Sequence, residues 1–404
     1  MLVSFSVENI LSFKGSQALR MEAVSSGKDD INPLNTFNVL GGDHTRLLKS
    51  ALMFGANASG KSNFIHAMAM FKDIVLRSQT VLEERESPAR QVTPFLLAKE
   101  STQQPSAMEV VFYEDGILYR YGLEVQAGRV SGEWLYYTPK ARETMLFVRE
   151  GQEVEYNKQG FPEAAPFVKG GKVQQTRESV PFVSLLATYN GTHSQNLVSW
   201  VNRLAIISGT REQGYMGFTI ELMKKDAEFK AWLLKVLSHF QIANLDVVEV
   251  ELVVTKTVAG GQEGLSVQFP LAFESEGTKK LIHLLGPIYD SIQNKRVLVI
   301  DELEAKFHSL LTRYLFHIYH QKNETGSQII AAAHDTSLMD TQYFRRDQIW
   351  FVDKNEHGSS EIYSLVEFKE RARQLKQQYG EDYLAGAFGA ISLFEKFDQI
   401  DEMM

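Results

Sequence analysis

The sequence predicts an α/β fold that combines a parallel sheet, an antiparallel sheet and an inserted helical lobe. Three observations lead to this prediction. Short, all-apolar segments at 51–54, 297–300 and 329–333 fit strands of a parallel sheet that is buried on both faces. Residues 108–138 alternate with a period of two around the turn pairs Asp115-Gly116 and Ala127-Gly128, which predicts an antiparallel meander. Helical patterns occupy much of the stretch after the meander.

The order of these patterns divides the chain into three expected parts. Residues 1–157 contain an N-terminal strand, the apolar strand at 51–54, a helix at 63–76 and the meander. Residues 158–245 are expected to form one helical lobe, with helices near 195–207 and 220–240. Residues 246–404 return to strands, continue through a helix from about 276 and the two later apolar strands, and end in a helical tail.

Composition excludes several classes of protein. The 404 residues include no cysteine, which rules out disulfides, thiolate nucleophiles and cysteine-ligated metals. No apolar run approaches the roughly 18–20 residues that span a bilayer, and the N-terminus does not resemble a signal peptide, so we expect a cytoplasmic protein without membrane contact. The net charge of −8 does not favour a dedicated nucleic-acid binder, although it still permits contact with DNA.

Residues 55–62 read GANASGKS, a G-x-x-x-x-G-K-[ST] phosphate-binding loop between an apolar strand and a helix. The glycines let backbone N–H groups approach a phosphate, Lys61 reaches its outer oxygens and the Ser62 hydroxyl is a ligand for Mg²⁺. The alternative interpretation, a glycine-rich turn, does not require this strand–loop–helix context. The predicted nucleotide-binding residues are Gly55, Asn57, Ser59, Gly60, Lys61, Ser62 and Asn63.

The second motif is the pair Asp301 and Glu302, which directly follows the apolar strand at 297–300. In this position Asp301 would hold Mg²⁺ and Glu302 would polarise the attacking water, as in a Walker B element. An Asp-Glu pair is common at strand ends, so its meaning comes from pairing with Lys61. The two motifs are 301 − 61 = 240 residues apart, and this interval requires an insertion between them.

Two further candidates lie near the second motif. His334 ends the next apolar strand, where open α/β sheets place groups that contact ligands. An isolated histidine is usually structural, but in this order His334 is expected to sense the γ-phosphate. Ser275 and Gly277 lie at the start of the preceding helix, which by itself indicates only a capped helix N-terminus.

With these four elements in this order, the chain resembles ABC-type ATPases of the SMC/RecF/OLD branch. The segments VENILSF and GANASGKSN are similar to that branch's first strand and phosphate loop, with Ala58 in place of the usual glycine. Within the branch the chain resembles stand-alone bacterial ATPases typified by RloA and, more loosely, AriA of the PARIS system. Segments in that style are PFLLA, FESEGTKKLIHLLGP, DELEAKFHSLL, AAAHDTSLMD and YLAGAFGAIS.

The resemblance implies roles for the candidates. Lys61, Glu302 and His334 would be the catalytic residues, and Ser62 and Asp301 would bind the metal. Ser275 and Gly277 would act in trans, so two chains would enclose ATP and Mg²⁺ in a homodimer or a higher homo-oligomer. His308 occupies a position where many relatives have aspartate, Gln91 is the nearest Q-loop candidate or an exposed loop residue, and Phe13 is either an adenine contact or a core residue.

The function implied is an ATP-hydrolysing switch, the sensor or regulatory ATPase of a bacterial anti-phage defence system. Only 404 − 334 = 70 residues follow the histidine, too few for a fused TOPRIM nuclease, so the effector would be a separate nuclease or toxin. The first alternative is a RecF/SMC-like DNA-repair ATPase that clamps DNA, which the acidic charge disfavours. A second is a scaffold that binds ATP without hydrolysis, which the presence of Glu302 and His334 disfavours.

Overall fold

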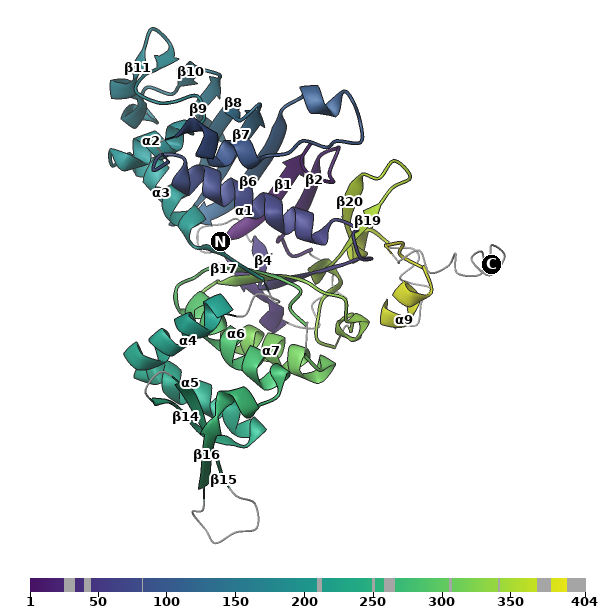
Figure 1. The fold of residues 1–404 in the computed structure, drawn as a ribbon. Helices are drawn as coiled ribbons and strands as arrows, with labels where there is room; N and C mark the ends of the chain where they lie inside the picture. The colour runs from purple at the N-terminus through teal and green to yellow at the C-terminus, as the bar shows by residue number, and fades with distance from the viewer. Residues whose placement is uncertain are drawn as a thin grey trace.

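The computed structural model describes residues 1–24, 33–39, 45–81, 83–208, 213–248, 251–257, 266–304, 307–340, 342–368 and 379–390. These residues form a large antiparallel sheet, a mostly parallel sheet and a lobe of helices and short strands. In Figure 1 the antiparallel sheet lies at the top, the parallel sheet crosses the middle and the lobe lies below. The predicted α/β fold, with a parallel sheet and an antiparallel β subdomain, is confirmed.

The antiparallel sheet begins with the meander that the sequence predicts. Its two tight turns join β6 (Ser106–Glu114) to β7 (Ile117–Gln126) and β7 to β8 (Arg129–Thr138). They hold Asp115, Gly116, Ala127 and Gly128 at φ values of 49°, 77°, 51° and 77°. Two successive residues at positive φ match the right-handed twist of the strands on either side. The N-terminal strand pairs with the first meander strand, so residues 2–8 belong to the same sheet. Its strands, within the described residues, are β11 (Val168–Lys169), β12 (Lys172–Val173), β10 (Glu153–Tyr156), β9 (Thr144–Glu150), β8 (Arg129–Thr138), β7 (Ile117–Gln126), β6 (Ser106–Glu114), β1 (Leu2–Glu8) and β2 (Gln17–Arg20), in that order across the sheet.

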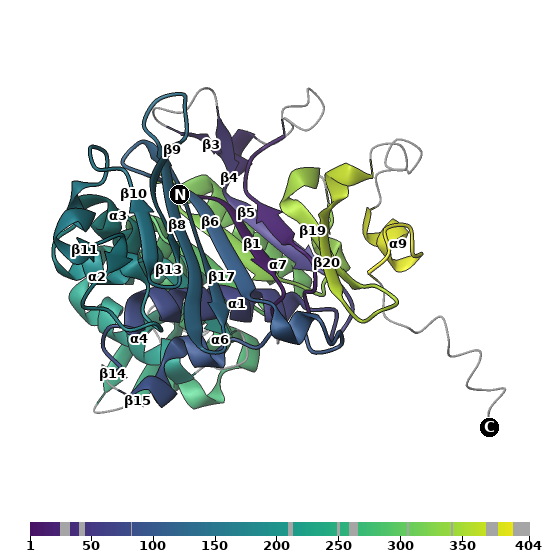
Figure 2. The ribbon, with the colours of Figure 1, turned by 90° about the horizontal axis from the view of Figure 1, so that it is seen from above.

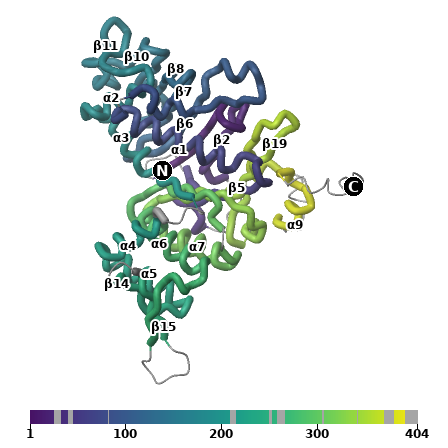
Figure 3. The backbone as a smooth tube through the Cα atoms, viewed as in Figure 1, coloured from purple at the N-terminus to yellow at the C-terminus, as the bar shows by residue number. Residues whose placement is uncertain are grey.

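The parallel sheet brings distant parts of the chain together. Its order is β13 (Leu204–Ser208), β17 (Val297–Asp301), β18 (Gln328–Ala332), β5 (Ser50–Phe54), β19 (Ile349–Lys354) and β20 (Ser360–Ser364), and only β20 runs antiparallel to its neighbour. Strands β5 and β18 are buried along their whole length, as the all-apolar pattern requires. In Figure 3 the purple β5 lies against strands from the green part of the chain.

Helix α1 (Lys61–Arg77) lies between the two large sheets, and Figure 2 shows it beneath the strands of the antiparallel sheet. Its apolar side chains point into the core shared with that sheet. Phe64 and Phe71 pack edge-on against Phe5 of β1, with ring centroids 5.7 and 5.6 Å apart. This packing fixes the start of the helix, which directly follows the phosphate loop, against the N-terminal strand.

The helical lobe differs from the prediction of one lobe over 158–245. Helices α2 (Phe182–Thr188) and α3 (Thr192–Asn202) belong to the core of the antiparallel sheet, where Trp200 stacks on Phe112 with centroids 4.5 Å apart. The helix expected to reach residue 207 ends at 202, and the apolar run that follows is β13, because such a run fits a buried strand as well as a helix. Helical periodicity alone does not say which sheet a helix covers.

The lobe below the parallel sheet is correspondingly smaller and mixed. It contains helices α4 (Gln213–Lys225) and α5 (Ala227–Leu237) and the small sheet of β14 (Ile242–Val248), β15 (Glu251–Thr257) and β16 (Ser266–Pro270). These elements share a second core with α6 (Glu276–Gln293) and α7 (Ser309–Lys322), which cover the lower face of the parallel sheet. Strands β3 (Thr36–Asn38) and β4 (Arg46–Leu48) form a separate pair.

Only part of the predicted helical tail can be compared with the structure. Residues 369–378 and 391–404 lie outside the described residues. Helix α9 (Tyr379–Leu384) and the turn after it pack beside β19. Tyr383 and Phe388 stack on Phe351 with centroids 5.5 and 5.4 Å apart, so this segment covers the β19 side of the parallel sheet.

Candidate nucleotide-binding site

The loop at 55–62 leaves β5 at the carboxyl edge of the parallel sheet and enters α1. Gly55 and Gly60 have φ values of 155° and 124°. A Cβ atom at Gly55 would lie 2.2 Å from the Val352 carbonyl oxygen, and one at Gly60 would lie 2.3 Å from Ser360 Oγ. Both glycines are therefore required by the close approach of the β19–β20 hairpin, in addition to any contact with a phosphate.

The same hairpin holds the loop through one serine. Ser360 Oγ lies 2.5 Å from the Ser59 carbonyl oxygen and 2.8 Å from Ser12 Oγ, and the Ser360 N–H donates to the Ser12 carbonyl. The phosphate loop is thus tied to the segment after β1 and to β20. Neither Ser12 nor Ser360 is among the residues predicted from the sequence, because their role arises from contacts more than 300 positions apart.

Ala58, the departure from the glycine of similar loops, lies at φ 63°. This left-handed conformation disfavours residues that have a Cβ atom. We expect Ala58→Gly to raise the free energy of unfolding by about 0.5–1 kcal/mol, because relief of this strain exceeds the added entropy of the unfolded glycine. Ala56→Gly, in the same loop but outside the left-handed region, should lower it by a similar amount. Chemical denaturation of both variants would measure the free energy of unfolding. Equal destabilisation by the two substitutions would contradict the claim that the Ala58 backbone is strained.

The Lys61 side chain lies at the centre of the loop. It is only 6% exposed, and its ammonium donates to the Gly55 and Ala56 carbonyl oxygens at 2.6 and 3.0 Å. Burial lowers its pKa to about 8, while the negative charges of Asp301, Glu304 and Glu302 oppose this shift. The structure therefore brings the lysine of the first motif next to the acids that follow β17, 240 residues later.

This pKa predicts a pH dependence of ATP affinity. A phosphate favours the charged lysine, so the Lys61 pKa is higher in the complex than the value of about 8 in the free protein. Below about pH 7.5 the ammonium is present in both states, and above pH 8 binding must take up a proton. We expect ATP affinity to fall by up to about tenfold per pH unit between pH 8 and 9.5. Calorimetry in buffers of different ionisation enthalpy would measure the proton uptake, and a constant affinity would contradict the prediction.

Asp301 and Glu302 lie where β17 ends. Asp301 Oδ1 is buried and has no hydrogen-bond partner among the described residues. A buried carboxylate oxygen without a donor fits a site for a hard cation. The other expected ligand, the Ser62 hydroxyl, belongs to the first turn of α1. Glu302 is exposed and has a left-handed backbone, with φ 54°. Its carbonyl accepts a hydrogen bond from Lys280 Nζ at 3.2 Å.

His334 follows β18, the strand between β17 and β5. Partial burial lowers its pKa, and the nearby Lys61 charge adds to this effect, while three carboxylates oppose it. A lowered pKa favours a neutral imidazole, which can both donate and accept a hydrogen bond. Its backbone N–H donates to Glu304 Oε1. Lys61, Asp301, Glu302 and His334 are therefore close neighbours at one edge of the sheet, as expected, and Glu304 joins them as an unpredicted member.

The expected trans-acting residues lie at the N-terminus of α6. Ser275 caps this 18-residue helix, since its Oγ accepts from the Thr278 N–H at 3.1 Å. Helix α6 contacts β17 and joins it through a short connection, so it runs antiparallel to that strand and its N-terminus points toward the strand's carboxyl end. Ser275 is exposed, Gly277 is half-buried, and Phe273 just before them is 79% exposed.

The remaining candidates are placed as follows. His308 is the N-cap of α7, where its Nδ1 accepts from the Leu310 N–H at 3.3 Å. Gln91 ends the short helix η3 (Pro88–Gln91) and is exposed, as its loop alternative requires. Phe13 is fully buried against Phe64, with centroids 5.9 Å apart, which makes it a core residue. Of the remaining loop residues, Asn57 is exposed and Asn63 is half-buried.

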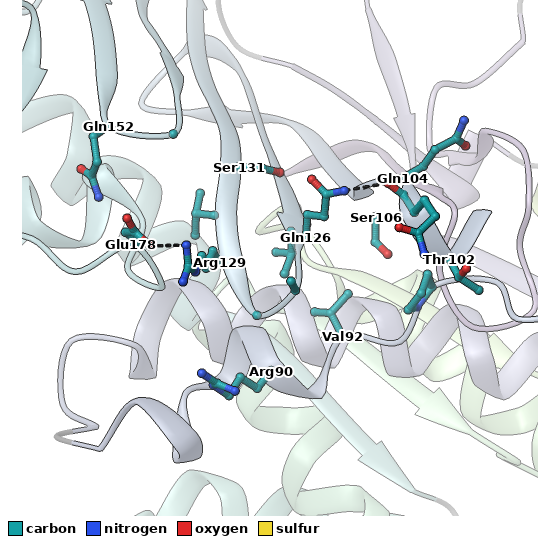
Figure 4. A pocket seen from close by; sticks show the side chains of 17 residues that line it. Arg90, Val92, Thr102, Gln104, Ser106, Gln126, Arg129, Ser131, Gln152 and Glu178 are labelled. Atoms are coloured by element: carbon teal, nitrogen blue, oxygen red, sulfur yellow. Dashed lines mark hydrogen bonds and ion pairs between the residues drawn. The ribbon is translucent and has the colours of Figure 1, made fainter. Parts of the chain in front are cut away.

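A separate polar hollow of about 760 Å³ lies at the β7–β8 turn and contains none of the predicted site residues (Figure 4). Arg129 on its wall pairs with Glu178 at 2.9 Å, and Gln126 donates to the Gln103 carbonyl at 2.7 Å. Arg129 and Gln126 thus already have partners within the chain, and we assign the hollow no role.

Comparisons with known proteins complete the description of the site. A family model described as "AAA domain, putative AbiEii toxin, Type IV TA system" matches residues 50–340, which include the phosphate loop, Asp301 and His334. No curated protein matches the chain. No helix among the described residues is both long and apolar enough to cross a membrane.

Three solved structures of SMC heads are similar to the chain. The SMC head domain from Thermotoga maritima has 13% identity and a TM-score of 0.43, covering 90% of this chain and 98% of that one. An SMC head bound to the C-terminal winged-helix domain of ScpA has 11% identity and a TM-score of 0.47, with coverage of 93% and 99%. A head with an extended coiled coil, bound to the C-terminal domain of ScpA derived from Pyrococcus furiosus, has 12% identity and a TM-score of 0.44, with coverage of 92% and 98%.

Proposed function

Because this chain belongs to the AAA-domain family described as putative AbiEii toxin of a type IV toxin–antitoxin system, we propose that it is an ATP-hydrolysing switch. One observation supports this proposal above all others. Lys61, held by the carbonyls of its own loop, is buried beside Asp301, Glu302 and Glu304, with His334 at the end of the intervening strand. This set contains a phosphate-binding lysine, a metal-binding acid, a base and a sensor.

Each residue has a separate task in the proposed reaction. Lys61 leaves the Gly55 and Ala56 carbonyls and binds the β- and γ-phosphate oxygens. Asp301 and Ser62 would hold Mg²⁺, which neutralises charge on the β- and γ-phosphates. Glu302 accepts a proton from the attacking water, and the imidazole of His334 orients that water or the γ-phosphate.

The N-terminus of α6 supports a composite site shared by two chains. Ser275 is exposed, and a helix N-terminus attracts anions through its backbone N–H groups. We propose that this end of α6 binds the γ-phosphate on a second copy, whose α6 does the same in return, as two-fold symmetry requires. The exposed Phe273 beside it would then be covered in the closed dimer. ATP would favour the closed dimer and hydrolysis would reopen it.

Lys280 offers a path from this contact to the reaction. It lies one and a half turns into α6, is buried, donates to the Glu302 carbonyl and lies 4.8 Å from the centroid of the Phe307 ring. A shift of α6 on dimer closure would therefore reach the backbone of the proposed base directly.

We further propose that this switch controls a separate effector, a nuclease or toxin, in bacterial defence against phage. The family description names a toxin of a toxin–antitoxin system, which supports a role with a paired protein. The test is co-purification with the product of the neighbouring gene, without nucleotide and with ATP in the Glu302→Gln variant, together with plaque assays. We expect a complex that depends on nucleotide state and fewer plaques. If neither is seen, the defence role fails and the ATPase proposal remains.

A further inference from the structure

Glu304 has no role in the proposed reaction, yet its side chain connects two parts of the site. It lies three residues after Asp301, in the turn that leaves β17. Its Oε1 accepts a hydrogen bond from the backbone N–H of His334, which follows β18. The Leu303 N–H also donates to the Ala332 carbonyl, so the turn after β17 is attached to the end of β18 at two points. The Glu304 side chain therefore links the turn after β17 to the backbone of His334.

The second oxygen of Glu304 is buried and has no hydrogen-bond partner among the described residues, as is also true of Asp301 Oδ1. Buried carboxylate oxygens in proteins are normally paired with a donor or a cation. The obvious internal donor, the Lys61 ammonium, donates instead to Gly55 and Ala56, and in the proposed reaction it moves to a phosphate. No donor among the described residues reaches Glu304 Oε2, so a ligand of the site can supply one.

We propose that Glu304 is a positioning residue of the ATP site that acts through both oxygens. Oε1 fixes the backbone of His334, and Oε2 accepts a hydrogen bond from a water that hydrates the cation beside Asp301. Mg²⁺ usually keeps several waters and is bound by one or two carboxylates, so a second acid next to its first ligand suits this cation. The inference rests on the proposed Mg²⁺-dependent ATP site and adds to it the residue that connects the cation to the sensor.

Two substitutions separate the two contacts. In Glu304→Gln the amide oxygen can still accept from the His334 N–H, but the amide nitrogen cannot accept from a water, so only the contact toward the cation is lost. Glu304→Ala removes both contacts. Glu324→Gln is the matched control, because it removes one negative charge from an exposed residue just after the C-terminal end of α7.

The experiment is a titration of free Mg²⁺ in which equilibrium ATP binding and turnover are both measured. For Glu304→Gln we expect the Mg²⁺ concentration at half-maximal ATP binding to rise about tenfold, the lower end of what loss of an outer metal contact costs, with Glu324→Gln unchanged. Glu304→Ala should show the same rise in the Mg²⁺ concentration at half-maximal ATP binding and, in addition, a lower kcat than the wild type. The double variant of Glu304→Ala and His334→Ala should have the same kcat as His334→Ala alone, since both substitutions act through the histidine.

The proposal would be overturned if both Glu304 variants needed the same Mg²⁺ concentration as the wild type. It would also be overturned if the losses of kcat in Glu304→Ala and His334→Ala multiplied in the double variant. The measurement of equilibrium ATP binding tests the role of Glu304 even if the protein does not hydrolyse ATP. A wild-type protein that binds ATP with Mg²⁺ but does not hydrolyse it would contradict the proposed ATPase alone, while the shift in Glu304→Gln would still decide the role of Glu304. A wild-type protein whose ATP binding ignores Mg²⁺ would overturn both.

Discussion

Glu302→Gln is expected to slow ATP hydrolysis by about 10²–10⁴-fold while ATP still binds. The amide has nearly the same shape as the carboxylate but cannot take a proton from the attacking water. Glu302 is exposed at the end of β17, and its position is set by its own left-handed backbone and by Lys280, so the substitution leaves the turn intact. Steady-state phosphate release and equilibrium ATP binding would measure the two effects.

The same variant should accumulate a closed dimer in ATP, because the step that reopens it is blocked. Light scattering coupled to size exclusion would detect it, and adding Ser275→Arg should prevent it. The control is Glu324→Gln, for which we expect wild-type turnover. Retention of more than about a tenth of wild-type turnover by Glu302→Gln would show that another group is the base.

The second large effect is expected for Lys61→Ala, which should weaken ATP binding by about 10–100-fold, the usual contribution of a charge-assisted hydrogen bond to a phosphate. Hydrolysis should fall below detection, since the ammonium also stabilises charge that develops on the transferred phosphoryl group.

Lys72 provides a matched control for this prediction. It lies on the same helix, and its ammonium also donates to a backbone carbonyl, that of Leu204 at 2.6 Å, but on the side of β13. Lys72→Ala should lower thermal stability and leave ATP affinity within about twofold of wild type. Equal losses of ATP affinity in both variants would mean that Lys61 acts through the stability of α1 and not on the phosphate.

The parts of the site that the sequence predicts are those set by local pattern and sheet topology. The phosphate loop is one continuous segment, and its strand and helix are readable from their apolar spacing. Asp301 and His334 each end an apolar strand, and the carboxyl ends of parallel strands meet at one edge, so their proximity to Lys61 follows once β17, β18 and β5 are neighbours.

The features that the sequence does not predict depend on contacts between distant residues. Ser12 and Ser360 hold the loop from opposite ends of the chain, and no local pattern distinguishes either from any other serine. Glu304 was open to recognition, since a second acid three residues after Asp301 is visible in DELE, but its meaning comes only from its bond to His334. The division of residues 158–245 between two cores likewise depends on tertiary packing, as the stacking of Trp200 on Phe112 illustrates.

The central claim is that one site needs two chains, and complementation measures it most directly. Lys61→Ala destroys the phosphate loop and Ser275→Arg destroys the end of α6, so each variant alone should be inactive. In an equal mixture half of the dimers pair one variant with the other, and each such dimer has one intact composite site. We predict recovery of about a quarter of the wild-type ATPase rate on mixing. A Ser275→Arg protein that is active alone, or a mixture that remains inactive, would contradict the composite site.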